Sequence, residues 1–186
     1  MIKICVIGLG YVGLPISLEI SKRFETIGFD TNLNRIKNLI KHKDTNNEFN
    51  KNEFKNKKLS FTSKISDIKT CNFYIICVPT PITSKKIPDL SALNKSFETI
   101  SKVLKKNDLV VLESTVYPGV TSHFEKYLEK KTKLAGNKDF YLCYSPERIN
   151  PGDKKNSLNK INKIFAINTK NKKIINIIKN VYKNLC

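Results

Sequence analysis

The sequence predicts an α/β fold built on a doubly wound parallel sheet. Three observations support this prediction: apolar strand-like runs alternate with helical patterns along the 186 residues, a glycine-rich turn follows the first run, and polar motifs follow several later runs. Alternating strands and helices are joined by right-handed crossovers, which produce a parallel sheet with helices on both faces. This length supports one well-cored domain, so we expect residues 1–186 to form a single domain.

The first strand and the turn after it organise the chain. Residues 2–7 are almost wholly apolar and β-branched, as expected of a strand buried on both faces. The turn that follows has the form G-x-G-x-x-G. In such a turn Gly8 permits a tight bend, Gly10 lets the backbone approach a pyrophosphate, and Gly13 lets the next helix pack closely. A helix is expected from Val12 to about residue 22, with its first amides directed at an anion.

The second apolar segment, residues 26–29, ends in Asp30. An acid at this distance accepts hydrogen bonds from the adenosine ribose hydroxyls and repels a 2′-phosphate, so the pattern favours NAD over NADP. Arg35 is a complication, because a nearby arginine can accommodate that phosphate. The structural alternative to a dinucleotide site is a tight strand-to-helix turn that binds nothing.

The remaining elements follow in order. The 41–58 stretch is polar, rich in lysine and asparagine, and typical of a mobile surface connection. A short apolar segment is expected around Ile65 and Ile68, and Asp89 is a candidate cap for the helix that follows it. Helices are predicted over 34–40, 90–104, 120–131 and 174–185, and strands over 59–62, 72–78, 109–112, 140–144 and 164–167.

Unusual residues gather after the carboxyl ends of the predicted strands, the edge at which ligands bind in an open α/β sheet. The segments concerned are 8–13, Asp30, 79–81, 113–115 and 145–153.

Composition narrows the classes of function. The formal net charge is +18, but only three of the 34 basic residues are arginine and the lysines are spread through every polar segment. This pattern argues against a nucleic-acid interface, which needs a focused patch. No stretch approaches a transmembrane span or a signal-peptide core, so we expect a cytoplasmic protein without a membrane partner. The five cysteines are expected to be mostly buried reduced thiols, and with two distant histidines we expect no metal site.

The motifs together resemble UDP-glucose/UDP-N-acetylhexosamine 6-dehydrogenases over essentially the whole chain. The similarity is greatest to the N-acetylhexosamine branch, which includes the Vi-capsule-type UDP-N-acetylglucosamine/galactosamine dehydrogenase. Where the UDP-glucose branch tends to carry a second glutamate, this chain has Pro151. The matching segments are Gly8–Pro15, Val78–Pro81, Pro88–Leu90, Glu113–Gly119 and Ser145–Asp153.

The resemblance implies NAD-dependent oxidation of a sugar C6 hydroxyl to a carboxylate, for surface polysaccharide synthesis. The family's reaction passes through a thiohemiacetal and a thioester on a cysteine, with two hydride transfers and a hydrolysis. The cofactor positions carried over, besides the three glycines, are Tyr11 and Val12 at the pyrophosphate, Asp30 and Arg35 at the adenosine ribose, and Pro79, Thr80 and Thr115 towards the nicotinamide.

Glu147 is carried over as the acid/base residue, together with Thr115 as a catalytic position. Arg148 and Ile149, with Glu147, are expected to contact the UDP-N-acetylhexosamine substrate. Each assignment has a simpler alternative: Thr80 and Thr115 as loop caps, Glu147 as a solvated acid, and Arg35 as a helix-surface cation. Cys77 and Cys143 lie within strands, where a structural thiol is expected rather than a nucleophile.

The family's nucleophilic cysteine lies beyond its first domain, and Cys186 does not match that cysteine's context. We therefore expect this chain to be the cofactor half, inactive alone and monomeric, whereas full-length members form homodimers or larger assemblies. Two alternatives stay open: a non-catalytic NAD-binding or partner-binding module, and another two-domain NAD dehydrogenase, of the 3-hydroxyacyl or 6-phosphogluconate type.

Overall fold

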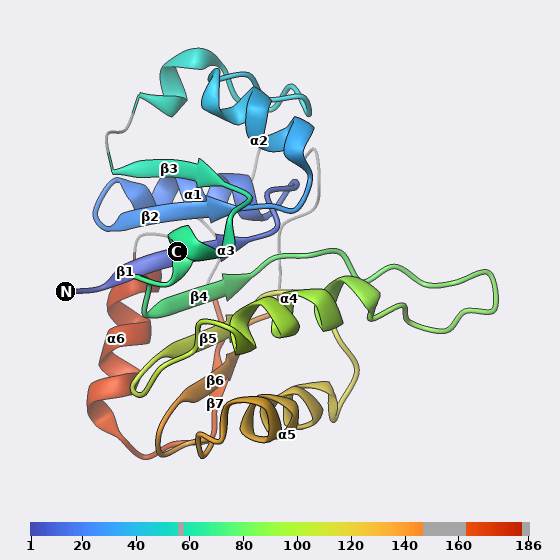
Figure 1. Cartoon of the computed structure of the whole chain (residues 1–186), viewed down its shortest axis with the longest axis vertical. Coiled ribbons are helices and arrows are strands. Elements are labelled where there is room, and N and C mark those ends of the chain that lie inside the picture. The colour runs from blue at the N-terminus through green and yellow to red at the C-terminus, as the bar shows by residue number, and fades with distance from the viewer. Residues whose placement is uncertain (56–57, 147–162, 184–186) are drawn as a thin grey trace.

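The computed structural model describes residues 1–55, 58–146 and 163–183 (Figure 1). Seven strands form one sheet in the order β3-β2-β1-β4-β5-β6-β7, and the first six are parallel. The predicted α/β architecture is confirmed. The strands are β1 (Lys3–Ile7), β2 (Glu25–Phe29), β3 (Leu59–Thr62), β4 (Phe73–Ile76), β5 (Leu109–Leu112), β6 (Tyr141–Tyr144) and β7 (Ala166–Ile167).

Helices cover both faces of this sheet, and the alternation of side chains along each strand explains how. From β1, Cys5 and Ile7 face one side and pack with α3, α4 and α5, whereas Ile4 and Val6 face the other side and pack with α1 and α6. Because both faces are covered, the strands are apolar throughout. The helices are α1 (Gly13–Ser21), α2 (Leu33–Ile40), α3 (Ile65–Ile68), α4 (Ser91–Ser101), α5 (Val120–Thr132) and α6 (Lys172–Tyr182), with a 3₁₀ turn, η1, at Lys51–Phe54.

The strand order determines where on the sheet a ligand would bind. After β1 the chain moves outward through β2 and β3, then returns to place β4 on the other side of β1. The carboxyl ends of β1 and β4 therefore lie at the point where the strand order reverses, which is where open α/β sheets bind ligands.

The last strand differs from the prediction of an all-parallel sheet. β7 pairs antiparallel with β6, through Tyr144 with Ala166 and Cys143 with Ile167, and it has only two residues. An apolar run indicates burial but does not specify the direction of a strand. Ile164, included in the predicted strand, is instead 53 % exposed.

The polar stretch 41–58 runs over the surface with most of its described side chains exposed, as predicted, but two of its side chains are buried. Phe54 is buried with Leu14, Leu18 and Leu39, and Asp44 is buried as well. Asparagine and lysine dominate the composition of the stretch, but the buried side chains of Asp44 and Phe54 anchor it to the domain.

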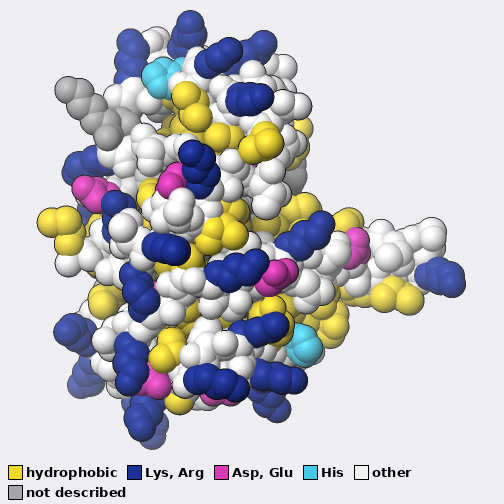
Figure 2. Space-filling model, in the orientation of Figure 1, with side chains coloured by type: hydrophobic (Ala, Val, Ile, Leu, Met, Phe, Trp, Pro, Cys, Tyr) yellow, Lys and Arg dark blue, Asp and Glu magenta, His cyan; other side chains and the backbone are white. Residues whose placement is uncertain are grey.

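A hairpin-like loop between β4 and α4 projects from the body of the domain (Figure 1). The main chains of Ile82 and Pro88 form an antiparallel bridge, and the amide of Thr83 donates to the carbonyl of Ile87. Elsewhere on the face shown in Figure 2, lysine and arginine side chains are spread over many elements rather than gathered over one. Among the described residues, none of the helices is both long and apolar enough to span a membrane.

Asp108 gives a pH-dependent prediction. Burial raises its pKa to about 6, although the backbone amide of Lys105 and the nearby lysine charge oppose this shift. Because the folded pKa lies above the unfolded value, the protonated form stabilises the fold, and this contribution is lost as pH rises from about 4 through 6. We expect Asp108→Asn to raise the melting temperature at pH 7 by about 2–4 °C and to have little effect at pH 4. Thermal unfolding across this range, with Asp139→Asn as control, provides the check; equal shifts at both pH values would contradict it.

Candidate functional site

The glycine turn joins β1 to α1 and contains two glycines that the fold itself requires. Gly8 has a φ of +89°, and its amide donates to the carbonyl of Phe29 at 2.9 Å, which ties the turn to β2. A Cβ on Gly13 would lie 1.8 Å from the carbonyl oxygen of Gly8, so no side chain fits there. These two positions agree with the predicted tight bend and close helix packing.

Gly10 is different, because a Cβ at this position would meet nothing within 4 Å. No atom of the protein excludes a larger residue at this position. A ligand that approaches the backbone closely would exclude one. Tyr11 is 50 % exposed beside it, and no side chain caps the start of α1 at Val12. A helix start without a side-chain cap is suited to an anion.

Asp30 lies directly after β2 and connects that strand to the turn. Its Oδ2 accepts from the amide of Leu9 at 2.8 Å, and its Oδ1 accepts from the amide of Asn32 at 2.8 Å. Each carboxylate oxygen retains a lone pair for a further donor, such as a ribose hydroxyl.

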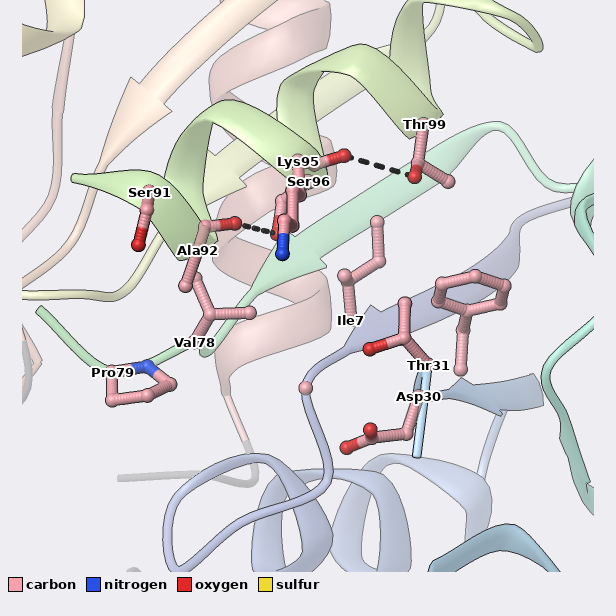
Figure 3. Close-up of a pocket in the computed structure, with 12 residues that line it drawn as sticks. Ile7, Asp30, Thr31, Val78, Pro79, Ser91, Ala92, Lys95, Ser96 and Thr99 are labelled. Carbon is pink, nitrogen blue, oxygen red and sulfur yellow. Dashed lines mark hydrogen bonds between the residues drawn. The ribbon is translucent and has the colours of Figure 1, made fainter. Parts of the chain in front are cut away.

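Two hollows adjoin Asp30. The first, about 260 Å³, lies between the strand ends and α4 (Figure 3). Ile7, Phe29 and Val78 give it an apolar floor, and the hydroxyls of Ser96 and Thr99 donate back to their own helix. Apolar walls with a few polar groups suit a flat heterocycle such as adenine. The second hollow, about 310 Å³, is polar and is lined by Leu9, Asp30, Asn32, Asn34, Arg35, Asn38, Thr45 and Asn46.

Arg35 is not the helix-surface cation of the simpler alternative. It is 8 % exposed, its Nε donates to the carbonyl of Leu9 at 2.9 Å, and its Nη1 forms an ion pair with Asp44 at 2.6 Å. Nη1 also donates to the hydroxyl of Thr45 at 2.8 Å. Its Nη2 is buried and has no hydrogen-bond partner among the described residues. Arg35 therefore lines the polar hollow, and its Nη2 group is not engaged by another described residue.

The ends of β4 and β5 are linked through their first loop residues. The hydroxyl of Thr80 donates to the carbonyl of Thr115 at 2.7 Å, and the hydroxyl of Ser114 donates to the carbonyl of Val78 at 2.6 Å. These bonds place Pro79, Thr80 and Thr115 side by side at the ligand edge. Because the Thr80 hydroxyl uses its proton within the protein, it can only accept a hydrogen bond from a further group.

Glu113, to which the sequence alone assigns no role, is fully buried behind this edge. Its Oε1 accepts from the hydroxyl of Tyr182 and its Oε2 pairs with Lys163, both at 2.5 Å. Burial, and then the charge of Glu113, raise the pKa of Tyr182, and the same causes raise that of Cys143 to about 12. Cys143 therefore stays a thiol at neutral pH, as expected of a structural cysteine. A charged residue directly after four apolar strand residues was the available signal.

The predicted substrate loop is described only at its start. The amide of Ser145 donates to the carbonyl of Leu112 at 2.9 Å, so the loop leaves the sheet at the ligand edge. Glu147, Arg148 and Ile149 lie outside the described residues. In the part of the chain that the structure describes, no three metal-ligating side chains come together.

The residues present fit a dinucleotide. Gly10 leaves space at the uncapped start of α1 for a pyrophosphate, and an apolar hollow adjoins Asp30. Asp30 and Arg35, whose buried Nη2 has no partner among the described residues, line the polar hollow beside it. The individual site assignments remain predictions.

Comparison with known proteins agrees with this geometry. The chain is 48 % identical to UDP-N-acetyl-D-glucosamine 6-dehydrogenase of Salmonella typhi and 44 % identical to that of Pseudomonas aeruginosa, over 99 % of its own length in both cases. It superposes on a UDP-D-ManNAc dehydrogenase of Pyrococcus horikoshii with a TM-score of 0.89 and 30 % identity, covering 99 % of this chain and 45 % of that one.

The chain spans only 43 % and 44 % of the two bacterial relatives, so it corresponds to less than half of each. The family model for the UDP-glucose/GDP-mannose dehydrogenase family, NAD binding domain, matches residues 2–186. The glycine turn, the acid after β2 and the match along nearly every residue agree: the chain belongs to the UDP-glucose/GDP-mannose dehydrogenase family and is its NAD-binding domain.

Proposed function

We propose that this domain serves the NAD-dependent oxidation of the C6 hydroxyl of a UDP-N-acetylhexosamine to the uronic acid, a precursor of surface polysaccharide. The observation that carries the proposal is the placement of Asp30, which is bonded to the glycine turn and adjoins both hollows at the reversal point of the sheet. The substrate class is supported by the names of the two bacterial relatives and by the Ser145–Asp153 motif.

The chain's own residues have separable roles in this proposal. Asp30 and Arg35 hold the adenosine ribose, and the backbone at Gly10, Tyr11 and Val12 holds the pyrophosphate. NAD, when bound, supplies the hydride acceptor for oxidation of the alcohol and then of the aldehyde.

Two further residue sets complete the proposal. The Thr80–Thr115 contact fixes the loops at the nicotinamide end. Glu147 acts as acid/base for the water that completes the carboxylate, and Arg148 and Ile149 shape the sugar site.

Since the relatives are more than twice as long, we propose that residues 1–186 bind NAD without completing the oxidation by themselves. In isolation this segment is expected to be monomeric.

Calorimetric titration of NAD into residues 1–186 tests the cofactor step. We expect Asp30→Ala to weaken NAD binding at least about tenfold, the effect of losing one charge-assisted acceptor. Glu25→Ala is the matched control, because it removes an exposed acid from the opposite end of β2. Unchanged affinity in Asp30→Ala, with the fold intact by circular dichroism, would contradict the assignment.

The substrate step is tested on the full-length gene product by following NADH absorbance with UDP-N-acetylglucosamine, UDP-N-acetylgalactosamine, UDP-glucose and GDP-mannose. Turnover of one of the N-acetylated sugars supports the proposal. NAD binding without turnover of any sugar would favour the non-catalytic module instead.

A further inference from the structure

The polar hollow beside Asp30 contains an arrangement that the family assignment does not explain. Arg35 lines this hollow, and an arginine next to the ribose acid is the feature that lets related folds accept the 2′-phosphate of NADP. Whether Arg35 does so here depends on how much of its charge reaches the hollow.

Asp44 determines how much of the Arg35 charge reaches the hollow. Its side chain is fully buried, and its Oδ1 lies 2.6 Å from Nη1 of Arg35. Its two oxygens also accept the amides of Asn46, Glu48 and Phe49 at 3.0–3.3 Å. Burial acts to raise the pKa of Asp44, but the bonds from Arg35 and from these amides outweigh it and leave the pKa lowered. Asp44 is therefore a buried carboxylate, and the Arg35–Asp44 pair carries no net charge.

The guanidinium is also fixed in place. Nε is bonded to the carbonyl of Leu9, and Nη1 is shared between Asp44 and the hydroxyl of Thr45. To pair with a phosphate, Arg35 would have to give up these buried bonds, which is costly. Only Nη2 has no partner among the described residues, and the N–H donors of an ion pair without net charge suit a hydroxyl better than a dianion.

The other groups around the hollow leave it without a net cation. Asp30 contributes a negative charge, and Asn32, Asn34 and Asn38 contribute neutral amides. A 2′-phosphate placed beside Asp30 would therefore meet one uncompensated carboxylate.

We propose that Asp44 is a cofactor-specificity residue: by pairing with Arg35 it makes the hollow beside Asp30 accept the 2′-hydroxyl of NAD and reject the 2′-phosphate of NADP. The proposal rests on NAD binding at this edge, and the role is one of positioning, because Asp44 acts through Arg35.

The test is the ratio of NAD to NADP affinity in residues 1–186, measured by calorimetry. We expect Asp44→Asn, which keeps the side-chain shape, to lower this ratio about tenfold by improving NADP binding. The gained NADP affinity should fall as salt is raised, since it depends on attraction between the phosphate and the guanidinium charge. Asp44→Glu retains the charge and should retain the preference. Asp67→Asn removes the same charge from an exposed site and is the control.

If the role of Asp44 is purely structural, Asp44→Asn will weaken the binding of both cofactors equally and leave the affinity ratio unchanged. That result would overturn the proposal. Since Asp44→Asn also loses amide contacts, Asn38→Arg provides a second route: it adds a second cation to the same hollow, beyond the one paired with Asp44, and Asp44 is left intact. Failure of Asn38→Arg to improve NADP binding would also overturn the proposal. A wild-type chain that binds neither dinucleotide would instead refute the cofactor assignment itself.

Discussion

Glu113→Ala is expected to lower the free energy of unfolding by about 3–5 kcal/mol, because it leaves the buried ammonium of Lys163 without this carboxylate. The side chain of Glu113 is fully buried and that of Lys163 is 3 % exposed, so water cannot replace the lost partner. The same change removes the acceptor of the Tyr182 hydroxyl. Urea denaturation followed by circular dichroism measures the loss.

The double variant Glu113→Leu with Lys163→Met is the control for this interpretation. Removing both charges together leaves no buried ammonium deprived of this carboxylate, so this variant should regain most of the stability lost in Glu113→Ala. If the double variant is no more stable than the single one, the loss comes from packing rather than from the buried charge.

The second large effect is a contrast between two glycines of one turn. Gly13→Ala places a methyl group where the carbonyl of Gly8 lies, so the main chain must move. We expect it to cost at least about 1–3 kcal/mol of stability and to abolish NAD binding. Gly10→Ala has open space for its methyl group, so we expect a normal melting temperature and NAD affinity reduced at least about tenfold.

Thermal unfolding and NAD titration on both variants distinguish architecture from ligand contact. The prediction fails if Gly10→Ala binds NAD like the wild type, because the space at Gly10 would then have no role in the pyrophosphate site. It fails equally if Gly13→Ala is as stable as the wild type.

Much of the fold was predictable because its signals are local. The strands β1, β4 and β5 are buried on both faces and are therefore continuous apolar runs, and the glycine turn and Asp30 follow their strands at fixed spacing. A local pattern is sufficient to predict an element when the burial of that element, or the turn after it, determines its residue types.

The features that were missed depend on contacts between distant parts of the chain. Nothing near Glu113 in the sequence indicates Lys163 or Tyr182, which are 50 and 69 residues away. Asp44 was missed for another reason: it is nine residues from Arg35, but it lies in a polar stretch whose composition does not indicate a buried carboxylate. The direction of β7 was likewise not encoded in its apolar residues.

The burial of Glu113 also has a consequence for the order in which the domain is completed during synthesis. Lys163 and Tyr182, which contact this carboxylate, are translated well after it: at about 5–20 residues per second the 69 residues to Tyr182 take on the order of several seconds. Until then the carboxylate stays hydrated, and β5 cannot settle into its final environment. We therefore expect β5 to reach its final packing only after α6 has been translated.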